Sequence, residues 1–387
     1  MKIGVNARLL TRPFTGIGQY TKNLFKELAK LDLSNQYILV VPEQVESKIA
    51  AQFSKNVEIK ILPEKKLPSA GMRKTWWEQI QLPKFFKEKK VDLAFYTYPS
   101  NPWAQDWYKN GIKTVVTVHD CIPWMNKHYR PGVLSKMYHA QGKKAVAKAD
   151  LVLTVSGESM KDIVEVCRVD KKKIEVLYND ADDVYKEIPH ERSVKEALER
   201  FSLKKDKFFL YVGGYDERKN VAYLLREFEK FHEDFRDIPL VLAGGKLFKN
   251  KLYASLDEND LGNVVRTGFL SETELAILYR NCTAFINLSK HEGFNIPILE
   301  AANCGAPIIL SDIAVHREVA ENAAIFVDIK KEGMAFEAMK KMVSHEVREK
   351  FSKNSEELAK KYSWKKYAKI LKDMLLSLAN QKTNGNK

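Results

Sequence analysis

The 387-residue sequence is poor in the residues that mark secreted or fibrous proteins. Its four cysteines, Cys121, Cys167, Cys282 and Cys304, are too far apart for a CxxC metal knuckle or a secreted disulfide framework. We therefore expect reduced thiols. With only 13 prolines and 18 glycines, and with 45% hydrophobic residues, the composition excludes collagen-like, low-complexity and wholly disordered chains.

Long apolar runs are missing as well. No run approaches the roughly 20 residues that span a bilayer, and the opening MKIGVNARLL lacks the pattern of a secretory signal peptide. We therefore expect a cytoplasmic protein. The net charge of +14 is uneven, because residues 1–150 hold 25 Lys and Arg against 12 Asp and Glu, whereas residues 151–387 hold 39 against 38. The first half is thus predicted to meet an anionic partner, either a membrane surface or nucleic acid.

Short apolar runs rich in β-branched residues alternate along the chain with segments of helical periodicity. The predicted strands are Lys2–Asn6, Tyr37–Val41, Val57–Leu62, Leu93–Tyr96, Thr114–Val118, Leu151–Val155, Ile174–Leu177, Phe208–Gly213, Leu240–Ala243, Val264–Thr267, Ala284–Leu288, Ile308–Ser311 and Ile325–Val327. Segments between them, such as Thr21–Leu31 and Asn220–His232, carry apolar residues three and four apart. This alternation predicts an α/β protein with parallel sheets covered by helices on both faces.

The alternation weakens once, in the polar stretch 179–207, and this predicts a boundary between two Rossmann-like doubly wound domains. We place the first domain at residues 1–190 and the second at residues 191–365. The remaining residues, 366–387, are predicted to form a C-terminal helix with a frayed tail. Its buried stripe would consist of Trp364, Tyr367, Ala368, Leu371, Leu375 and Leu378.

The most informative segment, SKHEGFNIPILE, begins at Ser289, directly after a predicted strand. Pro297 suits the first turn of a helix, so the preceding backbone amides can point at an anion. These are the amides of Gly293, Phe294, Asn295 and Ile296. Glu292 precedes that helix and Glu300 lies in its first turn, so both carboxylates can accept hydrogen bonds from sugar or ribose hydroxyls. The alternative makes Glu292 a dipole-favoured charge and Glu300 a solvated residue.

A second signal follows the first strand of the second half, in GGYDERKN. Gly213 and Gly214 allow close approach of the backbone, and Arg218 and Lys219 open the next helix. Cations are unfavourable at a helix N-terminus unless an anion is bound there, and a diphosphate would supply one. A solvated cationic helix start is the alternative.

These segments together resemble the retaining glycosyltransferases of family GT4, which have the GT-B fold of two facing Rossmann-like domains. The likeness covers nearly the whole chain, and its most specific element is E-x7-E, here Glu292 to Glu300. VVRTGFLSETEL and SDIAVHREVAENAAIFV are similar to the family's flanking segments, and VVTVHDCIPW to a segment of its mannosyltransferase-like members.

The resemblance implies roles for these residues. Glu292 would contact the donor sugar and Glu300 the nucleotide ribose, while Lys219 with Arg218 would hold the donor diphosphate. Many members have Arg where this chain has Gly214, so we assign the role of that cation to Arg218. Asn295 replaces a frequent glycine of the family, but only its amide is required.

The N-terminal half would bind the acceptor. In TGIGQY, Gly16 and Gly18 form a short glycine loop that by itself indicates only a tight turn. The resemblance implies that this loop approaches the donor phosphates and the acceptor. It also places His119, which follows a predicted strand, beside the transferred sugar instead of leaving it a polar loop residue.

The implied activity is that of a retaining hexosyltransferase in cell-surface polysaccharide synthesis. It would transfer a hexose from a nucleotide-diphosphate sugar, either GDP-mannose or a UDP-sugar, to a glycan or lipid-linked acceptor. GT4 enzymes are thought to react on one face of the sugar, with the leaving phosphate oxygen taking the acceptor's proton. Lys219, Arg218 and the amides would stabilise the departing diphosphate, so neither a metal nor another cofactor is expected.

Three other interpretations compete with this one. The DxD of Asp180 and Asp182 suits a hard metal ion, but it lies in the expected linker, where a solvated acidic turn is favoured. A basic nucleic-acid-binding protein would explain the charged first half, although no RRM, KH or helix-turn-helix signature accompanies it. A GT-B enzyme could also epimerise or hydrolyse a nucleotide sugar.

The residues between 65 and 90 predict a peripheral site on the inner face of an anionic membrane. Eight basic residues there oppose only two acidic ones. Four aromatic residues, Trp76, Trp77, Phe85 and Phe86, are interleaved with them. Aromatic rings beside cations are typical of interfacial binding. The alternative buries both tryptophans in the domain core.

Overall fold

The computed structural model describes residues 1–104, 111–126, 132–245 and 263–380. It divides into two compact units, Met1–Asn179 with Ser363–Lys387, and Asp180–Tyr362. The division falls at Asn179, ahead of the predicted residue 190. Residues after Asn179 already pack on the second unit, where Arg280 donates to the backbone oxygens of Tyr185 and Glu187 at 2.7 and 2.9 Å.

The first unit contains a seven-stranded parallel sheet with the strand order β3-β2-β1-β4-β5-β6-β7. Its strands are β1 (Lys2–Asn6), β2 (Gln36–Val41), β3 (Val57–Ile61), β4 (Leu93–Tyr96), β5 (Lys113–Val118), β6 (Leu151–Thr154) and β7 (Ile174–Val176). Its helices are α1 (Gly16–Leu31), α2 (Ser47–Ala50), α3 (Ala70–Trp76), α4 (Leu82–Glu88), α5 (Ile122–Met125), α6 (Gly132–Lys148), α7 (Gly157–Asp162) and α16 (Trp364–Asn380).

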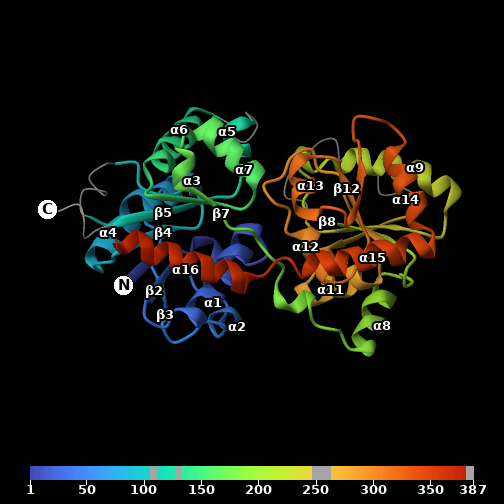
Figure 1. Cartoon of the computed structure of the whole chain (residues 1–387), viewed down its shortest axis with the longest axis horizontal. Coiled ribbons are helices and arrows are strands. Elements are labelled where there is room, and N and C mark those ends of the chain that lie inside the picture. The colour runs from blue at the N-terminus through green and yellow to red at the C-terminus, as the bar shows by residue number, and fades with distance from the viewer. Residues whose placement is uncertain (105–110, 127–131, 246–262, 381–387) are drawn as a thin grey trace. The chain divides into compact units, whose positions relative to one another are not determined.

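Helices cover both faces of this sheet (Figure 1). On one face Phe25 of α1 packs edge-to-face on Phe95 of β4, with ring centroids 5.1 Å apart. On the other face Trp77, Phe86 and Val146 belong to one buried cluster with alternate residues of the strands. Because helices cover both faces of the sheet, its strands carry apolar side chains on both sides.

The second unit contains a six-stranded parallel sheet with the strand order β10-β9-β8-β11-β12-β13. Its strands are β8 (Phe209–Val212), β9 (Leu240–Ala243), β10 (Val264–Gly268), β11 (Ala284–Asn287), β12 (Ile308–Ser311) and β13 (Ala324–Val327). Its helices are α8 (Glu191–Arg200), α9 (Val221–Asp234), α11 (Glu272–Asn281), α12 (Pro297–Asn303), α13 (Ala314–Ala320), α14 (Met334–Met342) and α15 (His345–Ala359). All the predicted strands are present, and the bounds differ from prediction by at most one residue at an end.

The core of the second unit lies between this sheet and helices on both faces (Figure 1). Tyr211 and Ile286 share a buried cluster with Phe228 of α9 and Met339 of α14. Phe285 of β11, which is not part of that cluster, packs edge-to-face on Tyr279 of α11, with ring centroids 5.4 Å apart. Because each sheet is parallel, the C-terminal ends of its strands lie at the same edge of that sheet, and doubly wound folds bind ligands at this edge.

The C-terminal helix α16 belongs to the first unit. Its predicted stripe is buried, and the rings of Trp364 and Tyr20 of α1 lie 6.1 Å apart. Lys372 Nζ donates to the carbonyl oxygen of Leu31, the last residue of α1, at 3.0 Å. The predicted fraying of residues 381–387 lies outside the described residues.

Two expectations from composition can be compared with the structure. All four cysteines are free and buried. Among the described residues, no helix is both long and apolar enough to cross a membrane.

Candidate active site

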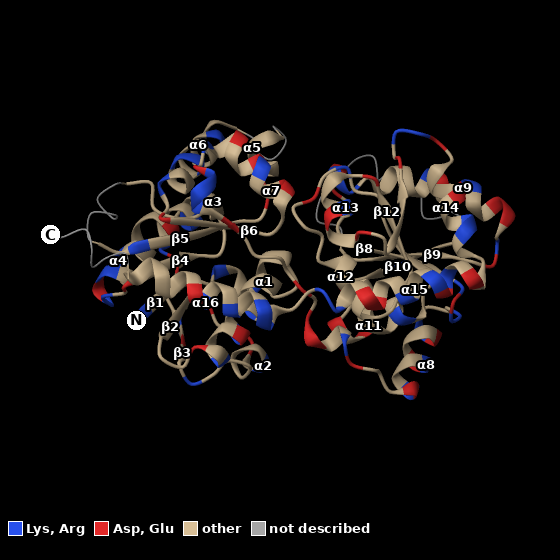
Figure 2. Cartoon of the chain, in the orientation of Figure 1, with Lys and Arg blue, Asp and Glu red and all other residues tan. Residues whose placement is uncertain are grey.

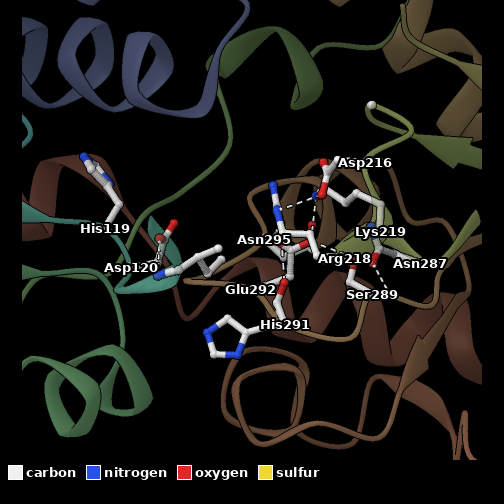
Figure 3. Close-up of polar contacts among 12 residues, drawn as sticks. His119, Asp120, Asp216, Arg218, Lys219, Asn287, Ser289, His291, Glu292 and Asn295 are labelled. Carbon is white, nitrogen blue, oxygen red and sulfur yellow. Dashed lines mark hydrogen bonds and ion pairs between the residues drawn. The ribbon is translucent and has the colours of Figure 1, made fainter. Parts of the chain in front are cut away.

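The predicted acid Glu292 lies in the loop after β11 and is the centre of a charged cluster (Figure 3). Arg218 Nη1 donates to Oε2 of Glu292 at 2.5 Å, and Lys219 Nζ donates to Oε1 at 2.6 Å. Ser289 Oγ lies 2.7 Å from the same Oε1. The structure therefore brings together three of the predicted site residues, Glu292, Arg218 and Lys219.

The two cations fix the ionisation of Glu292. Burial by itself would raise the pKa of this carboxyl group. The attraction of Lys219 and Arg218 outweighs burial and lowers the pKa of Glu292 to about 2. The group is an anion at neutral pH. Arg218 Nε also lies 3.2 Å from Oδ1 of Asp216, so two carboxylates balance the two cations.

The cations come from a 3₁₀ turn, Glu217–Lys219, between β8 and α9. They lie just before α9 instead of inside its first turn as predicted, because Asn220 has a left-handed φ of 56° that separates the turn from the helix. The backbone N–H of Lys290 donates to the carbonyl oxygen of Arg218 at 2.7 Å. This bond joins the loops after β8 and β11, and so holds the cations beside Glu292.

The loop before α12 contains a buried amide–imidazole pair. Asn295 has a φ of 76°, and its Nδ2 donates to Nε2 of His316 at 2.9 Å. Burial lowers the pKa of His316 to about 4, so the imidazole is neutral, with Nδ1 carrying the proton. A left-handed φ favours glycine, the residue that the family resemblance implied at this position.

The other predicted amides, of Gly293, Phe294 and Ile296, belong to the same loop, and α12 begins directly after it at Pro297. Asn295 Oδ1 is buried, with no hydrogen-bond partner among the described residues.

Glu300 faces different partners from Glu292. It is buried on α12, and Tyr279 Oη donates to its Oε2 at 3.0 Å. Burial raises the pKa of Glu300 to about 7 in spite of this hydrogen bond. The solvated alternative for Glu300 is therefore wrong. Ser289, His316 and Tyr279 were not predicted, since a single serine, histidine or tyrosine carries no signal by itself.

The predicted glycines after β8 sit in a tight contact with the next strand. Gly213 has a φ of 149°, and a Cβ on Gly244 would lie 2.2 Å from the carbonyl oxygen of Gly213. Tyr211 Oη donates to the carbonyl oxygen of Gly214 at 2.5 Å. Gly244 was missed by sequence reasoning, although LAGG at the end of a predicted strand is a signal of the same kind.

In the first unit, the two glycines of TGIGQY differ from each other. Gly18 is fixed by packing, because a Cβ there would lie 2.3 Å from the carbonyl oxygen of Arg12. Its N–H donates to Thr15 Oγ1, the N-cap of α1, at 3.1 Å. A Cβ on Gly16 would meet nothing within 4 Å. Packing therefore explains Gly18 and leaves Gly16 open to another role.

His119 lines a pocket of about 190 Å³ at the end of β5. Its Nε2 lies 2.8 Å from the carbonyl oxygen of Thr97, which can only accept, so Nε2 carries the proton. Burial lowers the pKa of His119 to about 4, although this hydrogen bond opposes the shift. The imidazole is neutral, and its Nδ1 is an acceptor suited to a hydroxyl group.

Beside His119 lies a cluster that sequence reasoning missed. The buried carboxylate of Glu78 accepts from Tyr98 Oη at 2.6 Å and from Tyr138 Oη at 2.7 Å. The Nζ of Lys74 lies 5.4 and 5.1 Å from the centroids of these two rings. Glu78 sits on a π-helical turn, Trp77–Gln81, and no sequence pattern predicts such a turn.

The DxD segment does not match the solvated acidic turn that was expected. Asp180 is buried, and its Oδ2 accepts from Lys186 Nζ at 2.9 Å, while its Oδ1 accepts from the backbone N–H of Ala181 at 2.7 Å. Burial raises the pKa of Asp180. Over the described residues, no group of three or more His, Cys, Asp or Glu side chains could hold a metal ion.

Two family models match the chain. Residues 14–183 match Glycosyltransferase Family 4, and residues 194–358 match Glycosyl transferases group 1. Together the two models cover most of both units.

Curated relatives agree with these matches. The chain is 26% identical to the O-antigen chain mannosyltransferase B of Escherichia coli over 85% of this chain and 87% of that protein. It is 30% identical to a Campylobacter jejuni N-acetylgalactosaminyltransferase that acts on a diphospho-undecaprenol substrate, over 63% of this chain and 64% of that protein. It is also 30% identical to the mannosyltransferase RfbU of Salmonella typhimurium, over 55% of this chain and 56% of that protein.

Solved structures share the fold at low identity. Anabaena HepE in complex with UDP and glucose has a TM-score of 0.75 at 12% identity, covering 97% of this chain and 99% of that one. Sucrose-phosphate synthase from Thermosynechococcus elongatus has a TM-score of 0.77 at 16% identity, covering 98% and 99%.

Proposed function

Because this chain belongs to the GT4 family of glycosyltransferases and has its GT-B fold, we propose that its second unit binds a nucleotide-diphosphate sugar at the Glu292 cluster. The chain is a hexosyltransferase, of a family whose members typically retain the configuration of the transferred sugar. GDP-mannose or a UDP-sugar is the proposed donor. The proposed acceptor is a glycan or a lipid-linked sugar in the synthesis of a cell-surface polysaccharide, as the names of the relatives suggest.

One observation supports the donor site above all: two cations and a carboxylate converge where β8 and β11 end. Lys219 has three N–H donors and uses one of them on Glu292, so the ammonium group can contact a phosphate at the same time. Glu292, held as an anion, can accept from hydroxyl groups of the donor sugar. Glu300 is the group proposed for the ribose hydroxyls.

The leaving diphosphate can be stabilised by these cations without a metal ion. Arg218 and Lys219 are fixed by their bonds to Glu292, so they need little reorganisation when charge develops on the phosphate. We propose that the acceptor's proton passes to the departing phosphate oxygen, and that His119 in the first unit orients a hydroxyl group through Nδ1. Metal and other cofactors are not needed in this scheme.

Nucleoside-diphosphate binding tests the proposal directly. GDP and UDP are added separately to the chain and thermal unfolding is followed, because a ligand specific for the native state raises the midpoint temperature. We expect one of them to raise it, and we expect the corresponding sugar nucleotide to turn over only when an acceptor is added. Turnover that is equally fast without an acceptor would indicate a hydrolase or an epimerase, and binding of RNA in place of either nucleotide would indicate a nucleic-acid-binding protein.

We also propose that the first unit rests on an anionic membrane, with a narrower contact than the sequence predicted. Trp77 and Phe86 are buried, and Trp77 Nε1 donates to the carbonyl oxygen of Leu62, so neither ring reaches a bilayer. Met72, Trp76 and Ile80 are exposed at 46%, 40% and 40%, and their spacing of four residues places them on one helical face.

Cations accompany this apolar face. Lys65 Nζ lies 5.3 Å from the ring centroid of Trp76. Figure 2 shows further Lys and Arg residues in α3 and α4, which belong to the same stretch of chain. Apolar side chains beside cations suit the headgroup region of an anionic bilayer.

A further inference from the structure

Two pockets in the first unit adjoin each other. The pocket of about 190 Å³ beside His119 and a second pocket of about 410 Å³ are both lined by Ile17, Lys74 and Tyr98. These three residues therefore lie where the two pockets meet. One molecule longer than a single sugar ring can occupy both pockets.

The larger pocket is cationic. Arg8, Arg12 and Lys74 line it, against one acidic residue, Glu43. Arg8 is ion-paired with Glu64 and lies over the ring of Trp77, with its guanidinium carbon 5.5 Å from the centroid. Among the described residues, its Nη1 is buried without a hydrogen-bond partner. Three cations around one pocket, one of them with a donor still to be satisfied, suit an anion with several oxygens such as a phosphate.

The smaller pocket has the chemistry of a sugar site. Tyr98, Trp124 and Tyr138 supply aromatic surface, and His119 and Asp120 supply polar atoms. Aromatic faces pack on the apolar faces of sugar rings, while the polar groups bind hydroxyls.

Lys74 joins the two environments. Its ammonium lies 3.8 Å from Oε1 of the buried Glu78 and above the rings of Tyr98 and Tyr138. Burial first, and then the charge of Glu78, raises the pKa of Tyr98 well above its usual value, so the phenol stays protonated and keeps donating to Glu78. The lysine is thus held at the junction, where it can contact a group placed between sugar and phosphate.

We propose that the two pockets bind one acceptor, a sugar carrying a phosphate or diphosphate, with the sugar beside His119 and the phosphate among Arg8, Arg12 and Lys74. The inference rests on the proposed function, because it names the chemical class of the acceptor. It also narrows that function, because a neutral glycan would leave the cationic pocket without a partner.

The test is calorimetric titration of the full chain with inorganic pyrophosphate in the presence of saturating GDP or UDP, which occupies the donor site. We expect a binding event that persists under these conditions. Arg12→Gln should weaken it at least tenfold, because Arg12 is exposed and its replacement leaves the core intact. Lys55→Gln, an exposed lysine that lines neither pocket, removes the same charge and should leave the event unchanged.

A second titration uses mannose 1-phosphate as the probe. Asp120→Asn keeps the oxygen that accepts from the N–H of Ile122, so the loop should stay in place. We expect this variant to weaken mannose 1-phosphate at least fivefold and not to weaken pyrophosphate. Equal effects on both probes would overturn the assignment of the smaller pocket to the sugar.

The outcomes separate the acceptor from other sources of phosphate. Pyrophosphate binding that disappears under saturating nucleotide, or that survives Arg12→Gln unchanged, overturns the inference. Vesicles containing phosphatidylglycerol provide the third arm, in which Arg12→Gln and Lys55→Gln should weaken binding equally. If Arg12→Gln lost vesicle binding and Lys55→Gln kept it, the pocket would be a site for a lipid headgroup and the inference would be overturned. Failure of every nucleoside diphosphate to bind would contradict the proposed function instead.

Discussion

Glu292 is held by opposite charges on two sides, and this decides how the cluster can act. Its pKa of about 2 means that no physiological pH neutralises it. Glu292 and Asp216 together balance the two cations in the folded protein, so a diphosphate would share Arg218 and Lys219 with these carboxylates. Removing one cation should therefore weaken binding of the donor more than it lowers the free energy of unfolding.

Lys219→Ala removes one of the two cations and so tests their role in donor binding. We expect turnover to fall by about 10²–10³, the usual cost of removing one preorganised donor to a developing charge, and nucleoside-diphosphate binding to weaken. Lys290→Ala is the matched control, since Lys290 is half exposed and faces Glu217 at 3.9 Å. Steady-state kinetics and thermal shifts on both variants make the measurement, and near-wild-type transfer by Lys219→Ala would contradict the donor site.

Glu300 gives a prediction with a pH signature. Its pKa is raised from 4.5 to about 7, so the folded protein holds a proton there that the unfolded chain releases. The associated stability is fully present below pH 4.5 and is lost as pH rises through 7, to a total of about 3 kcal/mol.

Glu300→Gln should therefore show a smaller loss of unfolding free energy between pH 5 and 8 than the wild type. The amide oxygen can still accept from Tyr279. Urea unfolding at the two pH values measures the effect, and Glu346→Gln, an exposed carboxylate on α15, should keep the wild-type difference. A wild-type pH difference in Glu300→Gln would show that Glu300 is not the titrating group.

The sequence predicted that Glu292 lies near Arg218 and Lys219, but not how the three side chains pair. The E-x7-E spacing and the RK after GGYDE identified Glu292, Glu300, Arg218 and Lys219. The cations beside Glu292 come from the turn after β8, and Tyr279, which donates to Glu300, lies on α11, so these contacts depend on how strands far apart in the sequence are ordered. Sequence spacing contains no information on that order.

At the scale of elements, the two glycines in the first turn of α1 separate a packing role from a role in ligand contact. We expect Gly18→Ala to lower the free energy of unfolding by about 1–3 kcal/mol, because its Cβ would collide with the backbone of Arg12. Gly16→Ala should change it by less than about 0.5 kcal/mol, since nothing lies near its Cβ.

Chemical unfolding and turnover are measured on both variants. Loss of turnover in a stable Gly16→Ala protein would support the ligand contact implied for Gly16. Equal stability losses in the two variants would contradict the packing explanation.

Helices and strands were largely predictable, because apolar periodicity reports burial directly. The strand ends of both sheets follow from it. The π-helical turn at Trp77–Gln81 does not, since the extra residue shifts which side chains face the core. Trp77 lies in this turn and Phe86 in α4, and both are buried although the surrounding stretch of sequence is rich in lysine.

For the whole molecule, the charge distribution predicts catalysis without a metal ion. Arg218 and Lys219 supply positive charge at the diphosphate, and Asp180 of the DxD segment is bound to Lys186. Addition of EDTA should therefore leave the rate of transfer largely unchanged. An absolute requirement for Mg²⁺ or Mn²⁺ that disappears when Asp180 and Asp182 are replaced would contradict this scheme and support a DxD metal site.

The membrane proposal also belongs to the whole molecule, because it depends on the excess charge of residues 1–150 and on one apolar face. We expect cosedimentation with vesicles to increase with anionic lipid content and to decrease with salt, since screening weakens the attraction of exposed cations. Trp76→Ser should weaken binding because it removes the aromatic side chain of the exposed stripe. Leu33→Ser replaces an exposed apolar residue in the turn after α1 and should have little effect.

Replacing Lys84, Lys87, Lys89 and Lys90 by serine separates charge from insertion. Each basic side chain near an anionic surface contributes about 1 kcal/mol, so the fourfold variant should lose most of the dependence on anionic lipid. It should keep any binding that comes from Trp76 and its apolar neighbours. If wild-type protein binds neutral and anionic vesicles equally, or binds neither, the membrane contact is wrong, and a soluble phosphorylated sugar becomes the acceptor to assay.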